Sequence, residues 1–173
     1  MNERSGIICA GNWIVDLVHD IDHWPDESNL ARISNQSQGI GGGPANVISA
    51  LARLKTEILL CPIGAVGSDA YGTFILEECR SLGLSIEHIK IKSKTATAHT
   101  HVMSVAGRSR TFFYQGGAND VISEKDFPLS TFKKSCAKIF YLGYLTLLGE
   151  LDTFYEKNLT GAAKVLKRAQ NAG

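Results

Sequence analysis

The chain has 173 residues, of which 44% are hydrophobic and 20% charged, a composition typical of one soluble globular domain or part of a larger one. Eighteen basic and seventeen acidic side chains leave a net charge of +1, which offers no general field for nucleic acid or an anionic membrane. No apolar run approaches the ~20 residues that span a bilayer, and the N-terminus lacks the apolar stretch of a signal peptide. We therefore expect neither nucleic-acid nor membrane binding.

The first half of the chain alternates short apolar runs with polar segments. Residues 7–10 predict a buried strand that ends at Gly11, and residues 14–18 stay mostly apolar around one acid, Asp16. Residues 30–34 fit an exposed strand, which the polar NQSQ follows. A helix is expected to begin at Pro44, because proline at the first helical position needs no N–H there.

A second strand and helix follow. Residues 58–63 predict a buried strand, and residues 64–67 the turn after it. Asp69 is placed to cap a helix that ends near Gly83, a residue type suited to the C-terminal cap. Residues 86–91 alternate as a strand does.

The rest of the chain adds three strands and a helix. Residues 97–106 and 111–115 predict strands joined by a hairpin-type turn, residues 139–142 a buried strand, and residues 151–169 a helix. Strands that alternate with helices favour a parallel sheet covered by helices. The polar strands near 30–40 and 97–115 do not fit that sheet, and we expect them to form a small separate β element. No strand follows the last helix, the pattern of the front portion of an α/β protein.

Four cysteines, Cys9, Cys61, Cys79 and Cys136, lie among apolar neighbours, and none forms a CxxC pair. Each is expected to be a small buried hydrophobic residue rather than a disulfide or zinc ligand. Without a secretion signal, this predicts a reduced, cytoplasmic protein.

The richest glycine cluster has the sequence GIGGGPAN, which contains Gly41, Gly42, Gly43 and Asn46. Glycines at a helix start let the backbone approach a ligand, and the free N–H groups there attract negative charge. The Asn46 side chain both donates and accepts hydrogen bonds, which suits vicinal hydroxyls. A flexible loop is the plain alternative. A dinucleotide-binding loop is the other, but it needs GxGxxG directly after a buried strand, and here the third glycine is missing and NQSQ precedes.

Three further groups carry candidate chemistry. Asp16 sits in the apolar IVDLV, where a carboxylate is costly without partners, so it is a candidate ligand group at a strand end or else a surface acid. His99 and His101 share one strand face, but no third metal ligand is evident, so we expect a solvated or ligand-facing strand. Arg108 and Arg110 flank the turn and are interpreted as a solvated hairpin tip.

These segments together resemble the PfkB family of carbohydrate kinases, also called ribokinase-like. The sequence GGGPAN, then ALARL, then IGAVGSDAYG is similar to that family's first signature in order and spacing. The first strand with Asp16, the segment GGAN at 116–119 and YLGY at 141–144 match in the same order. The resemblance spans residues 6–171.

The resemblance implies a Rossmann-like three-layer α/β fold with a small β-sheet lid, here in part. It implies transfer of the γ-phosphoryl group of ATP, with Mg²⁺, to a hydroxyl of a sugar or nucleoside. The positions that match the family's substrate-binding residues are Asp16, Gly41 and Gly42 with the adjoining Gly43, Asn46, and, in a looser alignment, Thr100. Many members carry a polar residue where this chain has Ile14, so the hydroxyl pattern that is read may differ.

The family's catalytic base is the Asp of a GAGD motif, and this motif does not occur in this chain. The family's nucleotide-binding segments belong to the C-terminal part of its members. The resemblance therefore assigns residues 1–173 to the N-terminal, acceptor-binding portion, with no catalytic or cofactor-binding residue of its own. A non-catalytic sugar-binding module or degenerate relative remains the alternative. The apolar face of the lid strands must be covered by substrate, by the α/β domain or by the lid of a second copy in a homodimer.

Overall fold

The computed structural model describes residues 4–134, 137–156 and 158–173. The helices and strands are β1 (Gly6–Gly11), β2 (Ile14–Ile21), β3 (Ile33–Gly41), α1 (Gly43–Arg53), β4 (Leu60–Gly67), α2 (Ala70–Ser81), β5 (Ile89–Lys92), β6 (His99–Val105), β7 (Thr111–Gln115), α3 (Leu129–Lys134), β8 (Ala137–Gly143), β9 (Phe154–Glu156), β10 (Leu159–Thr160) and α4 (Gly161–Asn171). Three short 3-10 helices lie at 117–119, 124–126 and 149–152.

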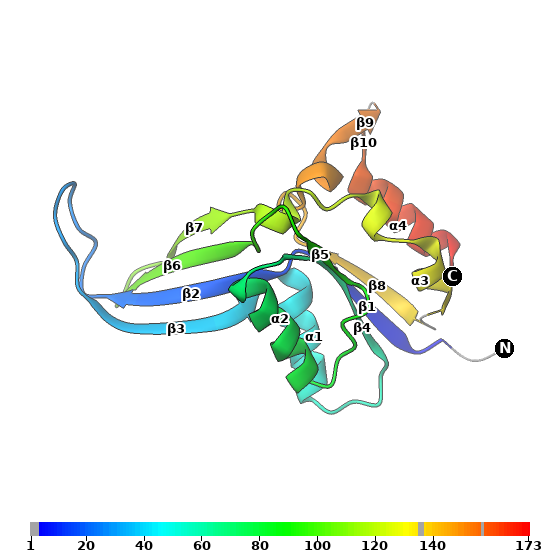
Figure 1. The fold of residues 1–173 in the computed structure, drawn as a ribbon, viewed down its shortest axis with the longest axis horizontal. Coiled ribbons are helices and arrows are strands. Elements are labelled where there is room, and N and C mark those ends of the chain that lie inside the picture. The colour runs from blue at the N-terminus through cyan, green and yellow to red at the C-terminus, as the bar shows by residue number, and fades with distance from the viewer. Residues whose placement is uncertain (1–3, 135–136, 157) are drawn as a thin grey trace.

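A parallel sheet forms the middle of three layers. Its strands run in the order β5, β4, β1, β8, with α1 and α2 on one face and α3 and α4 on the other (Figure 1). Each face has its own core, with Ile48 and Ile75 buried on the α1–α2 side and Ile8, Ile63 and Val165 on the α4 side. The predicted α/β architecture is confirmed.

A second sheet, in the order β3, β2, β6, β7, projects from one end of the parallel sheet (Figure 1). The residues expected to form a separate β element fall in β3, β6 and β7. Two expectations need correction. The segment around Asp16 is β2, a central strand of this second sheet, and not the end of a core strand. The polar NQSQ lies inside β3, because an edge strand with both faces exposed needs no apolar side chains.

Predicted turns and boundaries differ at two places in the parallel sheet. Residues 64–67 are the second half of β4 and not a turn. Gly64 is needed there for space, because a Cβ on it would overlap the indole of Trp13. Only part of the strand expected at 86–91 forms, as β5 (Ile89–Lys92), which pairs with residues 64–67.

The prediction of a long helix at 151–169 is wrong. The chain instead makes a 3-10 turn, the β9–β10 hairpin, and then α4. Asn158 adopts a positive φ of 65° between the two strands, and Thr160 starts the helix by accepting a hydrogen bond from the Ala163 N–H at 3.2 Å. The other helix signals are confirmed: Asp69 caps α2 through the Gly72 N–H at 2.8 Å, and Gly83 has a φ of 73° just past that helix.

Three cysteines are free thiols, with Cys9 and Cys79 buried and Cys61 half-buried. Burial raises the pKa of Cys9 and Cys79 to about 12 and that of Cys61 to about 11, so all three are unreactive. Cys136 lies outside the described residues. In the part of the chain that the structure describes, no helix is long and apolar enough to cross a membrane.

Candidate functional site

A cleft of about 630 Å³ opens where the second sheet meets the start of α1 and the loop after β8. Its polar lining comes from Asp16, Asn46, Thr100, Arg110, Tyr114 and Tyr144. Its apolar lining comes from Ile14, Val18, Val102, Phe112 and Leu147, and Gly42 completes the wall. Four residues singled out from the sequence, Asp16, Gly42, Asn46 and Thr100, therefore line one cleft, although they come from three separate segments.

Asp16 and Thr100 are neighbours on adjacent strands. Asp16 of β2 lies opposite Thr100 of β6 on one side and opposite Gly39 of β3 on the other. Partial burial raises the pKa of the Asp16 carboxyl, while a hydrogen bond with the Thr100 side chain and the charge of Arg110 act in the opposite direction. The result is a partly desolvated carboxylate, a strong acceptor for hydroxyl hydrogen bonds.

The glycine loop shapes the wall beside Asp16. A Cβ at Gly41 would overlap the Asp16 carboxylate, so only glycine leaves that carboxylate in place. Gly42 has a φ of 92°, and a Cβ there would overlap the backbone oxygen of Asn12. A Cβ at Gly43, the first residue of α1, would lie 2.7 Å from the Tyr141 hydroxyl. At each of the three glycines, a different neighbouring group lies too close for a side chain.

Asn12 is a buried residue that the sequence did not single out. Its Oδ1 accepts hydrogen bonds from the Gly43 N–H at 3.1 Å and the Tyr144 N–H at 2.8 Å, and its side chain is fully buried. It therefore ties the start of α1 to the loop after β8, two walls of the cleft. Its position directly after Gly11, at the end of β1, was the available signal, because ligand groups gather at the carboxyl ends of parallel strands.

Asn119 supports the cleft from the other side. It is fully buried and bonds both backbone groups of Trp13, with its Oδ1 accepting from the N–H at 3.3 Å and its Nδ2 donating to the carbonyl at 3.2 Å. The same Nδ2 donates to the Tyr114 hydroxyl at 3.3 Å. The GGAN segment was part of the family resemblance, so the sequence did mark it, although without a role.

Arg108 and Arg110 are both exposed, as expected of a solvated turn, but Arg110 also lines the cleft. Strand alternation puts Arg110 on the same face as Phe112 and Tyr114. Its guanidinium carbon lies 5.5 Å from the centre of the Phe112 ring, a cation–π distance. Sequence alone sees a polar, turn-forming GRSR and cannot tell which way its side chains point.

His99 and His101 share a face, as expected, but it is the face away from Asp16. His19 joins them, with its Nε2 3.1 Å from His101 Nδ1 and the two rings stacked at 5.3 Å. Burial, and then the charges of His19 and His99, lower the pKa of His101. Among the described residues, no three His, Cys, Asp or Glu side chains are grouped so that they could hold a metal ion.

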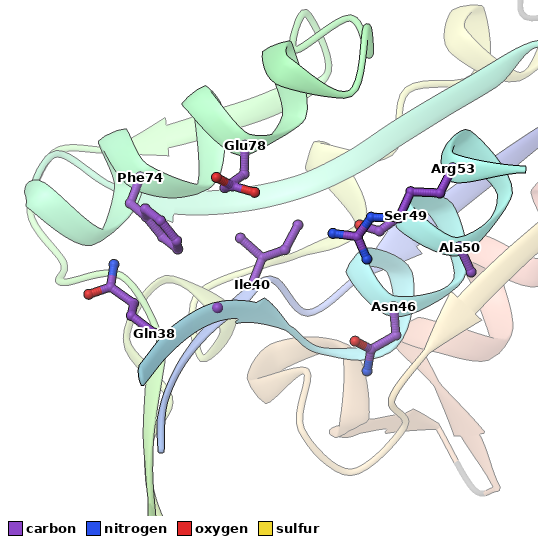
Figure 2. A pocket seen from close by; sticks show the side chains of 9 residues that line it. Gln38, Ile40, Asn46, Ser49, Ala50, Arg53, Phe74 and Glu78 are labelled. Atoms are coloured by element: carbon purple, nitrogen blue, oxygen red, sulfur yellow. The ribbon is translucent and has the colours of Figure 1, made fainter. Parts of the chain in front are cut away.

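A second hollow, of about 360 Å³, lies between β3, α1 and α2 (Figure 2). Arg53 reaches into it from α1, and Phe74 and Glu78 reach into it from α2 (Figure 2). Asn46 lines both hollows, and Figure 2 shows it pointing away from Phe74 and Glu78. Apart from Asn46, this hollow contains none of the predicted site residues.

The environment of the glycine loop also bears on the dinucleotide alternative. A dinucleotide fingerprint leads from a strand of the parallel sheet into a helix. Here the glycines follow β3, an exposed edge strand of the second sheet, and only then enter α1. The donors and acceptors around the loop instead form a set suited to hydroxyl groups: a carboxylate, an amide, a threonine and two tyrosines.

Known sugar kinases are similar to this chain in sequence. The chain is 27% identical over 148 residues to a probable fructokinase-5 from Arabidopsis thaliana, covering 83% of this chain and 43% of that protein. It is 28% identical over 120 residues to an ATP-dependent ribose-1-phosphate kinase from Halopiger xanaduensis, covering 69% and 40%. The chain thus spans about two fifths of the length of these relatives.

Solved structures share the fold over nearly all of this chain. A ribokinase from Giardia lamblia superposes with a TM-score of 0.79 at 20% identity, covering 98% of this chain and 48% of that one. A fructokinase from Xylella fastidiosa gives a TM-score of 0.71 at 25% identity, covering 98% and 50%. The model of the family described as pfkB family carbohydrate kinase matches residues 5–171. This chain belongs to the pfkB family of carbohydrate kinases.

Proposed function

We propose that this chain provides the acceptor-binding portion of an ATP-dependent kinase that phosphorylates a hydroxyl of a sugar or nucleoside. The observation that carries this proposal is the convergence of Asp16, Asn46 and Thr100 on one cleft beside the glycine loop. Family membership and relatives named as sugar kinases support it.

Within this proposal, each side chain has a distinct part. The Asp16 carboxylate and the Asn46 amide hold hydroxyls of the acceptor, and Thr100 fixes Asp16 by a side-chain hydrogen bond. Gly41 leaves room for that carboxylate. Orienting the acceptor hydroxyl is a large part of phosphoryl transfer, because catalysis rests mainly on positioning and charge stabilisation.

ATP and Mg²⁺ are assigned to the part of the relatives that this chain does not span. ATP bound there would supply the phosphoryl group. The base is assigned to the same part, and a positioned base typically contributes about 10²–10⁴-fold. The 173 residues alone are therefore expected to give no useful ADP release with any sugar.

The second sheet is proposed to act as a lid and as the contact of a homodimer. Its far end and the loop after β2 expose large apolar side chains, with Trp24, Ile33 and Phe113 each 43–51% exposed. Trp24 and Phe113 stack with ring centres 6.3 Å apart, so the two exposed rings form one apolar patch. Light scattering is expected to give twice the chain mass, and Trp24→Ser with Phe113→Ser is expected to give the single mass.

The proposed function is tested by titration calorimetry of the protein with ribose, fructose and adenosine. At least one is expected to bind, and Asp16→Asn is expected to weaken that binding at least about tenfold, since hydrogen bonds to a charged group contribute about 1.5–3 kcal/mol. His101→Gln, on the opposite face, is the control and should bind as the wild type does. Equal binding by Asp16→Asn and the wild type would contradict the proposal.

ADP release by a protein of the relatives' full length that contains this chain distinguishes a kinase from a non-catalytic sugar-binding module. ADP release by that protein, dependent on the sugar that binds, is expected for the kinase. Sugar binding without ADP release would instead establish the module.

A further inference from the structure

We propose that the acceptor molecule carries an anionic group, a carboxylate or a phosphate ester, which Arg110 binds. This inference rests on the proposed function, because it assigns a substrate class to the same cleft. The observation behind it is the positive charge of Arg110 in the lining of the cleft. Binding the hydroxyls of a neutral sugar does not require such a charge.

Strand register gives the cleft two chemically different ends. Asp16 lies opposite Thr100, which in turn lies opposite Tyr114, so one row of polar groups crosses the sheet next to α1. The next row on the same face is apolar, with Val18 opposite Val102 and Val102 opposite Phe112. Arg110 lies beyond that row.

The Arg110 guanidinium lines the cleft and, among the described residues, has no carboxylate partner. Its carbon lies 5.5 Å from the centre of the Phe112 ring, a cation–π distance. No carboxylate of the described residues lies within 4.0 Å of the Arg110 nitrogens. Asp20, on the same face of β2, accepts a hydrogen bond from the Asn35 Nδ2 at 3.1 Å instead. The charge of Arg110 acts on Asp16 and lowers the pKa of its carboxyl, but the hydrogen-bond partner of that carboxyl is the Thr100 side chain.

An acceptor that fits both ends has hydroxyls at one end and an anion at the other. The hydroxyls would meet Asp16 and Asn46, the carbon skeleton would pass over Val18 and Val102, and the anion would reach the five N–H donors of Arg110. The planar fork of arginine matches carboxylate and phosphate oxygens in a bidentate manner, so both groups satisfy the same site. A neutral sugar would use only the Asp16 end.

Titration calorimetry of matched ligand pairs tests the inference. Ribose and ribose 5-phosphate form the phosphate pair, and glucitol and gluconate form the carboxylate pair. For the wild type, the charged member of at least one pair is expected to bind about tenfold tighter than its neutral partner, and the pair that shows this preference identifies the anion. Arg110→Gln should abolish the preference, so that the charged and neutral members of the pair bind with equal affinity. Arg108→Gln removes the same charge from the same turn and should keep the preference.

The outcomes separate this inference from the proposed function. Equal binding of charged and neutral ligands, both weakened by Asp16→Asn, overturns the inference and leaves the function standing. Ligand binding that Asp16→Asn does not weaken overturns both. Loss of preference in Arg108→Gln as well as Arg110→Gln points to net charge alone and also overturns the inference. The preference should fall as KCl rises from 50 to 500 mM, since exposed charges are screened.

Discussion

The second sheet has two faces of opposite character, although the same strands build both. The cleft face carries Asp16, Val18, Thr100, Val102, Phe112 and Tyr114. The outer face carries Val15, Leu17, His19, His99, His101 and Phe113. Near α2 the outer face is packed, with Leu17 5% exposed and Tyr71 of α2 against His99. Neighbours in sequence such as Asp16 and Leu17 therefore lie on opposite faces, with Asp16 in the lining of the cleft and Leu17 in the packed core.

Gly41→Ala is expected to have the largest effect on the cleft face. The added methyl group would overlap the Asp16 carboxylate and displace it, and a misplacement of about 1 Å can cost about 100-fold in function. Calorimetry with the sugar that binds measures the loss. Gly39→Ala is the matched control in the same strand, because nothing lies within 4 Å of a Cβ there. Equal losses in the two variants would show that β3, and not Asp16, is what the methyl group disturbs.

Asp16→Asn is expected to separate binding from stability. Binding falls at least about tenfold, as argued above, but the folded protein becomes more stable at neutral pH. Because burial raises the pKa of Asp16 in the folded state, its ionisation costs stability as the pH rises past the pKa of the unfolded chain. Urea unfolding at pH 4 and pH 7 should show the variant gaining on the wild type at the higher pH. A constant difference would mean that Asp16 is not desolvated.

Tyr114→Phe is expected to have a smaller effect on the same face. It removes the hydroxyl that accepts a hydrogen bond from Asn119 Nδ2, which keeps its bond to the Trp13 carbonyl. A net neutral hydrogen bond is worth about 1 kcal/mol, so binding and stability should each change by no more than about fivefold in equilibrium constant. The dissociation constant and the urea midpoint measure this, and a loss as large as that of Asp16→Asn would make Tyr114 a principal ligand.

His101→Gln is expected to change the pH dependence of stability and to leave sugar binding unchanged. The pKa of His101 is lowered in the folded state, so the unfolded chain binds more protons and wild-type stability falls as the pH drops through about 6.5. Thermal unfolding at pH 7.5 and pH 5.5 should show a smaller acid loss in the variant than in the wild type. Asp16 acts in the opposite direction in both proteins, so the difference between them isolates His101. An unchanged acid loss would place the cause elsewhere.

The parallel sheet and four residues of the cleft could be predicted from the sequence for a physical reason. Buried strands such as residues 7–10 are continuous apolar runs, and a glycine cluster before a helix start is rare enough to mark a candidate site. Asp16 stood out because a carboxylate inside an apolar run needs a partner. These features are local, and local patterns survive into the structure.

The residues that sequence reasoning missed depend on long-range contacts. Asn12 is bonded to Gly43 and Tyr144, which are 31 and 132 positions away, so its place at the end of β1 marks the position but not these partners. Arg110 sits in a polar turn just before β7, and the alternation of that strand puts it on the cleft face with Phe112 and Tyr114. The 151–169 segment is a different case: it had helical spacing throughout, but Phe154–Glu156 pairs with Leu159–Thr160 in a local hairpin that delays the helix to Gly161.

We propose that an acceptor sugar binds one face of the second sheet, and methyl NMR tests this most directly. Val18 and Val102 place their methyl groups on the cleft face, whereas Val15 and Leu17 place theirs on the outer face of the same strands. Titration with the sugar that binds is expected to shift the Val18 and Val102 signals and leave those of Val15 and Leu17 in place. Shifts confined to Val15 and Leu17, or none that saturate with the sugar, would contradict it.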